Sequence, residues 1–108
     1  MNLKTQEYIC TLAECGSITE AAKRLYISQP ALSMYISNVE KSMGIQLFDR
    51  SGKNLKLTYT GELYVHKARQ MIELQDEFER EVNDIRAGIT GRIRIGLQRK
   101  RSTTLTVN

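Results

Sequence analysis

Residues 16–44 have the sequence GSITEAAKRLYISQPALSMYISNVEKSMG, which is the pattern of two helices joined by a short turn. Ser17 caps the first helix, and Glu20, three residues later, reaches back to complete a capping box. Ser28 caps the second helix, and Pro30 lies in its first turn, where the missing N–H breaks no hydrogen bond. Both helix starts are therefore specified by local sequence.

The second helix has an apolar stripe and a polar face. Four apolar residues recur at helical spacing and predict the buried stripe: Leu32, Ile36, Val39 and Met43. The opposite face carries short polar side chains, with Gln29 and Ser33 at its exposed N-terminal end. This pattern indicates a helix-turn-helix over residues 18–37, whose second helix enters the major groove of DNA N-terminus first. An ordinary helical hairpin in a small α domain has the same pattern, so the pattern alone leaves that alternative open.

A small hairpin, or wing, is predicted over residues 47–57. Short apolar runs at 47–48 and 55–57 flank a segment with Ser, Gly and Asn, which favour a turn. Arg50 and Lys53 lie on or beside this turn. Two interpretations remain open: a solvated hairpin, or a wing whose cations contact phosphates or the minor groove and so position the second helix.

One long helix is predicted over residues 59–88. Inward positions recur along it at alternating steps of four and three, as in an a/d heptad seam: Tyr64, Ala68, Met71, Gln75, Phe78, Val82 and Ile85. A small domain cannot bury so long a stripe, so we expect a dimerisation helix that pairs with a second copy. Gln75 is polar at an inward position, where such a residue often fixes the register of pairing.

Several classes of protein are disfavoured by composition. The net charge of +4 arises mainly from residues 88–108, which hold five basic and no acidic residues, so charge alone is weak support for nucleic-acid binding. No apolar run is long enough for a membrane span or a signal peptide, which predicts a cytoplasmic protein without a membrane partner. Cys10 and Cys15 have no partner at metal-ligand spacing, and the single histidine belongs to no catalytic set. We expect no metal, no cofactor and no enzymatic activity.

Specific motifs extend this interpretation. They are AAKRLYISQPALS, the pair Val39-Glu40, Gly44, Leu47-Phe48-x-Arg50 and Leu57-Thr58-x-x-Gly61. In these motifs the chain, from about residue 3 to residue 96, resembles the N-terminal domain of a LysR-type transcriptional regulator. The resemblance implies a mainly α fold: a winged helix-turn-helix domain over residues 1–58, with three helices and a small β-hairpin wing, followed by a long dimerisation helix. It also implies that residues 89–108 begin a truncated effector domain, with a first strand and a basic tail, so the chain is expected to be a fragment.

The resemblance further implies function. LysR-type regulators bind inverted-repeat operators in double-stranded DNA as homodimers, often paired into tetramers, and the full-length proteins contact RNA polymerase. Their DNA-contact positions map here onto Thr19, Ser28, Gln29, Pro30, Ser33, Met34, Ser37 and Lys53, to which the hairpin adds Arg50. Gln29 is expected to bind adenine through its amide, and Lys53 is expected to bind a phosphate. Met34 stands where the family often has arginine, so contact with a thymine methyl group is expected there rather than a guanine contact.

Two other functions remain open alongside sequence-specific DNA binding. The chain would be a coiled-coil oligomerisation module without DNA reading if the heptad seam were its whole function. The other possibility is the DNA-binding end of a recombinase. It requires a catalytic acidic cluster, and no such cluster appears in the sequence. The small polar face of the second helix favours DNA binding, because a helix used only for packing has no reason to leave Pro30, Ser33 and Ser37 facing outward.

Overall fold

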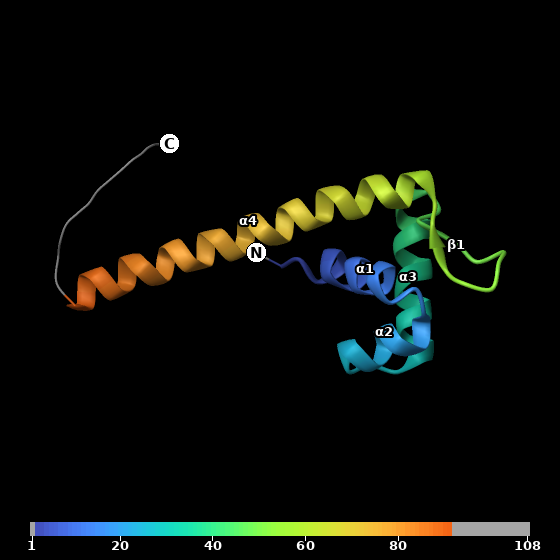
Figure 1. Cartoon of the computed structure of the whole chain (residues 1–108), viewed down its shortest axis with the longest axis horizontal. Helices are drawn as coiled ribbons and strands as arrows, with labels where there is room; N and C mark the ends of the chain where they lie inside the picture. Colours follow the sequence, from blue (N-terminus) through green and yellow to red (C-terminus); the bar gives the residue numbers. More distant parts are fainter. Residues whose placement is uncertain (1, 92–108) are drawn as a thin grey trace. The chain divides into compact units, whose positions relative to one another are not determined.

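The computed structural model describes residues 2–91 (Figure 1). Its elements are α1 (Lys4–Cys15), α2 (Ile18–Leu25), α3 (Gln29–Met43), β1 (Phe48–Asp49), β2 (Lys56–Leu57) and α4 (Tyr59–Gly91). The mainly helical fold, with a two-stranded wing and a long C-terminal helix, confirms the predicted fold class. The chain divides into two units, Met1–Leu74 and Gln75–Asn108.

The expected local signals start and end the helices of the first unit. Ser17 Oγ accepts the amide of Glu20 at 3.3 Å, and Ser28 Oγ accepts the amide of Ala31 at 3.2 Å. The turn between α2 and α3 is made at Tyr26, which adopts the left-handed conformation with φ of 59°. Only Gly and, less often, Asn adopt this conformation without appreciable strain, so Tyr26 stores a little strain at the turn.

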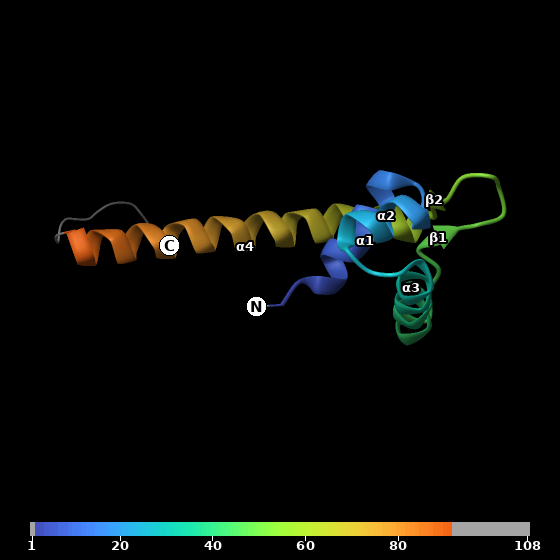
Figure 2. The ribbon, with the colours of Figure 1, turned by 90° about the horizontal axis from the view of Figure 1, so that it is seen from below.

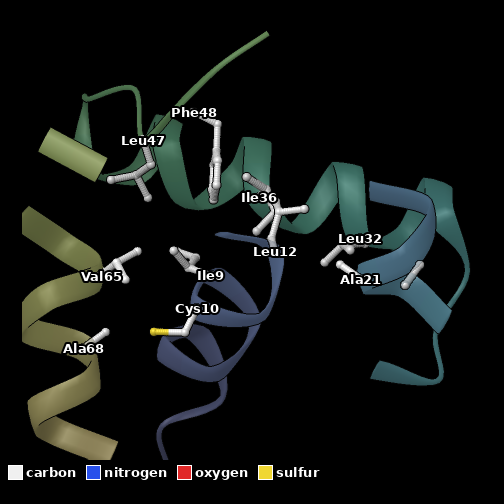
Figure 3. Close-up of a cluster of buried hydrophobic side chains, with 11 residues drawn as sticks. Ile9, Cys10, Leu12, Ala21, Leu32, Ile36, Leu47, Phe48, Val65 and Ala68 are labelled. Carbon is white, nitrogen blue, oxygen red and sulfur yellow. The ribbon is translucent and has the colours of Figure 1, made fainter. Parts of the chain in front are cut away.

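The core of the first unit is built from all four helices and the segment that leads into β1. Its largest fully buried side chains are Phe48, Ile9, Leu12, Leu32, Ile36 and Leu47. Figure 3 shows Val65 and Ala68 of α4 directed toward Ile9 and Cys10 of α1. The first unit therefore extends into α4, beyond the predicted boundary at residue 58.

This packing corrects one prediction about the heptad seam. The periodicity places Ala68 on the stripe that faces a second copy, but Ala68 is 1% exposed and lies in the core of its own unit. Tyr64 is also half-buried against that core. The first turns of α4 bury one face within the chain, and a sequence repeat cannot distinguish a face buried within the chain from one buried by a partner.

The start of α4 is fixed by Thr58 and Gly61. Thr58 Oγ1 accepts the amide of Gly61 at 2.9 Å and donates to the carbonyl oxygen of Gln46 at 2.6 Å. A Cβ on Gly61 would lie only 2.9 Å from the carbonyl carbon of Leu47 and would overlap its oxygen. Glycine is therefore required for α4 to approach the backbone that leads into the wing.

In the second unit, the described residues 75–91 form one helical segment. The helix continues to Gly91, whereas the sequence predicts that it ends at residue 88. A glycine inside a helix costs only about 1 kcal/mol relative to alanine, so it weakens the helix without ending it. The predicted strand and basic tail lie outside the described residues, as does most of the proposed start of an effector domain.

Candidate nucleic-acid interface

The N-terminus of α3 is exposed and carries no acidic side chain in its first turn. Ser28 satisfies one of the free amides, while the aligned peptide dipoles leave partial positive charge at this end of the helix. Thr19, at the start of α2, donates through Oγ1 to Oε1 of Gln29 at 3.2 Å. The structure thus brings together three predicted contact residues at one helix end, which is electrostatically suited to a phosphate-rich ligand.

The remaining predicted contact residues of α3 follow that end along the helix. Pro30 and Met34 are exposed, with Met34 at 66%, whereas Ser33 and Ser37 are half-buried. The opposite stripe is anchored by Leu32 and Ile36, which are fully buried. Met34 offers an apolar contact, and the serines beside it offer small hydrogen-bonding groups. These groups complement the methyl, donor and acceptor groups that bases present in the major groove.

The wing is a two-stranded antiparallel hairpin in which Phe48 pairs with Leu57 and Asp49 pairs with Lys56 (Figure 2). Lys53 is exposed in the loop between the strands. Near the base of the loop, Ser51 donates to Oδ1 of Asp49 from its hydroxyl at 2.7 Å and from its amide at 2.9 Å. These hydrogen bonds from Ser51 hold the pKa of the Asp49 carboxyl below its usual value.

A buried carboxylate ties α3 to the wing. Glu40 Oε2 accepts the amides of Leu47 at 2.8 Å and Phe48 at 3.1 Å, and Oε1 forms an ion pair with Arg50 at 3.4 Å. The Glu40 side chain is 9% exposed, whereas that of Arg50 is 40% exposed. Glu40 therefore fixes where the wing begins relative to α3. Arg50 has this structural partner, so any phosphate contact would use its other N–H groups.

Sequence reasoning missed the role of Glu40, although a signal was present. Leu32, Ile36 and Glu40 follow one another at steps of four, so Glu40 lies on the buried stripe of α3. A carboxylate at a buried position requires donors, and the amides at the start of the wing supply them. Met43, which the sequence assigns to the stripe, is instead 40% exposed.

α4 also exposes apolar side chains in each of the two units, and these are candidates for contact with a protein partner. In the first unit these are Tyr59, Leu63, Met71 and Leu74, and in the second unit they are Phe78 and Ile85. Val82 is half-buried. Gln75 donates through Nε2 to Oε2 of Glu79 at 3.4 Å along the same helix. Leu63 and Leu74 do not belong to the predicted seam, yet they are among the large apolar residues that α4 leaves open.

Residues 2–91 contain no group of three His, Cys, Asp or Glu side chains placed to hold a metal ion. Cys10 is buried, and burial raises the pKa of its thiol, with partial opposition from the Arg69 charge. A thiol of this kind is a poor nucleophile. None of the described helices has the combination of length and apolar character needed to span a bilayer.

Comparison with known proteins identifies relatives of the part of the chain that carries this interface. A family model described as "Bacterial regulatory helix-turn-helix protein, lysR family" matches residues 3–62. The "Probable RuBisCO transcriptional regulator" of Chlorokybus atmophyticus is 40% identical over 94 residues, which is 87% of this chain and 30% of that protein. The "Uncharacterized HTH-type transcriptional regulator YcgK" of Bacillus subtilis is 36% identical over 97 residues, 90% of this chain and 30% of that protein. The chain thus spans about a third of the length of these relatives.

Two solved structures are similar to this chain in fold as well as in sequence. The BenM DBD in complex with catB site 1 DNA superposes with a TM-score of 0.77 at 33% identity, covering 82% of this chain and 98% of that one. Full-length CbnR complexed with its target DNA superposes with a TM-score of 0.66 at 32% identity, covering 82% of this chain and 30% of that one. Both similar structures contain DNA.

Proposed function

The chain belongs to the lysR family of bacterial regulatory helix-turn-helix proteins, and from this premise we propose that it binds double-stranded DNA sequence-specifically as part of a transcriptional regulator. The N-terminus of α3 enters the major groove, and the wing lies against the DNA backbone. The observation that carries this proposal is the exposed first turn of α3. It has no acidic residue, and the helix behind it is held rigidly by a buried stripe.

Individual residues have different roles in this proposal. Gln29, Pro30, Ser33 and Met34 face base edges, and Thr19, Ser28 and Ser37 flank them. Lys53 binds a phosphate from the wing, and Arg50 assists while bound to Glu40. Glu40 supports both surfaces, because it joins the buried side of α3 to the first residues of the wing.

We further propose a homodimer that binds an inverted repeat in the cytoplasm, with a tetramer formed from two such dimers. The support is the row of apolar side chains that α4 exposes, with Phe78 60% exposed in the second unit. Met71, Gln75, Phe78, Val82 and Ile85 keep the heptad spacing of a partner-facing seam, and Gln75 sets its register. In a regulator of the relatives' full length, contact with RNA polymerase follows as part of the same proposal.

The DNA proposal is tested with a duplex selected from a randomised library by the protein itself. Gln29→Ala should weaken binding to the selected duplex by about 1–3 kcal/mol and relax preference at one base pair, while the salt dependence stays nearly the same. Lys53→Ala should weaken selected and random duplexes alike and reduce the salt slope by about one. If Gln29→Ala weakens both duplexes equally, α3 does not recognise bases at this position.

The dimer proposal is tested by sedimentation at micromolar concentration. Phe78→Asp should dissociate the assembly, because it places an unpaired charge in an apolar interface. Asn83→Asp is the matched control, since it adds the same charge to an exposed position off the seam. A wild-type chain that sediments as a monomer with full helicity contradicts the proposal, as does equal dissociation by both variants.

The alternative function, a coiled-coil oligomerisation module without DNA binding, rests on the same exposed residues of α4. It gives no reason for the exposed first turn of α3 or for the exposed lysine in the wing loop. It predicts that Phe78→Asp abolishes assembly, and that the wild-type chain enriches no sequence from a randomised library.

A further inference from the structure

We propose that Thr19 is a positioning residue that holds the amide of Gln29 with its amino group free to face DNA, so that Gln29 prefers guanine over adenine. This inference rests on the proposed entry of α3 into the major groove, and it replaces the adenine contact expected from sequence. The observation behind it is the 3.2 Å hydrogen bond from Thr19 Oγ1 to Gln29 Oε1.

The hydrogen bond has a defined direction. A carbonyl oxygen only accepts, so the single hydroxyl hydrogen of Thr19 is the one that is used. Gln29 Oε1 is thereby directed toward α2, and Nε2, with its two hydrogens, is directed away from Thr19. Both residues are exposed, so the remaining donors of Gln29 stay accessible to a ligand.

The two helices that carry this pair are held firmly against each other. Ala21 and Ala22 of α2 and Leu32 of α3 are buried in the common core. Thr19 and Gln29 lie in the first turns of their helices, and each turn is fixed by a serine cap. The hydroxyl of Thr19 therefore acts from a fixed position and orders a glutamine side chain before DNA arrives. This order reduces the entropy lost on binding.

The chemistry of base edges then separates the two purines. Adenine offers N7 as an acceptor and N6 as a donor, so a bidentate glutamine must accept through Oε1 and donate through Nε2. In this structure Thr19 uses one of the two acceptor positions of Oε1 and holds this oxygen toward α2, so that Oε1 and Nε2 are not turned together toward one base. Guanine offers two neighbouring acceptors, N7 and O6, to a donor group such as Nε2, whereas adenine places its N6 donor against that group. A glutamine held in this way is a donor group, and guanine is the purine that it fits.

The test uses the selected duplex with each of the four base pairs placed at the position that Gln29→Ala relaxes. Three proteins are compared: wild type, Thr19→Ser, which keeps the hydroxyl, and Thr19→Val, which keeps the branched shape and loses it. Wild type and Thr19→Ser should bind the guanine duplex on the order of tenfold more tightly than the adenine duplex. Replacing that guanine by 7-deazaguanine should remove most of the preference. In Thr19→Val the preference for guanine over adenine should fall severalfold or move to adenine, while thermal stability stays at the wild-type value.

Other outcomes overturn the inference. Preference of the wild type for adenine contradicts the assigned amide orientation. A Thr19→Val variant that loses affinity equally for selected and random duplexes shows that Thr19 binds the DNA backbone instead. An unchanged guanine preference in Thr19→Val shows that Thr19 does not orient Gln29, while the proposed function stands if Gln29→Ala still relaxes that position. If wild type fails to distinguish selected from random DNA, the proposed function itself fails.

Discussion

Replacing Glu40 by alanine should destabilise the first unit strongly, although the side chain that is removed is charged and not apolar. The carboxylate accepts two amides at the start of the wing, at 2.8 and 3.1 Å, from Leu47 and Phe48. Both of those residues are buried in the core, so water does not readily replace the lost acceptor. Alanine has a slightly higher helix propensity than glutamate, so α3 itself should not be weakened.

The magnitude follows from the unsatisfied groups. A buried donor left without an acceptor costs about 1–3 kcal/mol, so two amides give a loss of roughly 2–6 kcal/mol for Glu40→Ala. Arg50 adds little, because its side chain is 40% exposed and water can solvate it. Glu40→Gln retains one acceptor oxygen for the two amides and loses only the charge, so its loss should be about 1 kcal/mol.

Urea unfolding followed by circular dichroism at one fixed protein concentration measures these differences. Glu73→Ala is the matched control, because it removes an exposed glutamate from a helix of the same unit. Its effect should stay within about 0.5 kcal/mol. A Glu40→Ala variant no less stable than this control would refute the reasoning, and so would a Gln variant as unstable as the Ala variant.

Three other predictions test separate features of the structure. Gly61→Ala should lower the free energy of unfolding by about 2 kcal/mol, because its Cβ would overlap the backbone that leads into the wing. Gly88→Ala has open space around it and should stabilise α4 by up to about 1 kcal/mol. Urea unfolding and helix content measured by circular dichroism compare the two variants. Tyr26→Asn should raise the melting temperature slightly and Tyr26→Val should lower it, because the residue is 94% exposed with φ of 59° and only its backbone conformation matters. NMR titration should give a pKa for Asp49 below 3.8, the usual value for aspartate. The stabilisation from the charged form is therefore present above the unfolded pKa and is lost as the pH falls through the lower folded pKa. Ser51→Ala should raise the folded pKa of Asp49, because it removes the hydroxyl donor.

Most helix boundaries could be predicted because they depend on neighbouring residues. Ser17 and Ser28 cap their helices as the sequence indicates, and Gly44 ends α3 in the left-handed conformation. These signals act within one turn of helix, so no tertiary information is needed to recognise them. The end of α4 was less predictable, because Gly88 lowers helix propensity without forbidding a helix.

The features that could not be predicted all depend on contacts distant in sequence. The stripe of α4 divides into a part that packs on α1, where Ala68 is buried, and a part that stays exposed, such as Phe78. Periodicity gives the face of a helix but does not identify what covers it. The link from Glu40 to the wing and that from Thr19 to Gln29 join residues seven to ten positions apart, through a loop or a turn whose path the sequence does not define.

The candidate site was accessible to sequence reasoning in its residues but not in its chemistry. Residue type and position place Gln29 at the first turn of α3 and Lys53 in the wing loop. The amide orientation of Gln29 depends on Thr19, and the available donors of Arg50 depend on Glu40. In both cases a neighbouring residue decides which atoms of the side chain are available to a ligand, while the residue that contacts the ligand stays the same.

The central claim, sequence-specific DNA binding by the N-terminus of α3, is tested most directly by one titration. The wild-type chain is titrated with its library-selected duplex and with a shuffled duplex of the same composition, at one physiological salt concentration. We predict that the selected duplex binds at least about 10³-fold more tightly, as specific complexes do. Equal affinity for the two duplexes would contradict the account, because a basic protein that binds only phosphates does not distinguish them.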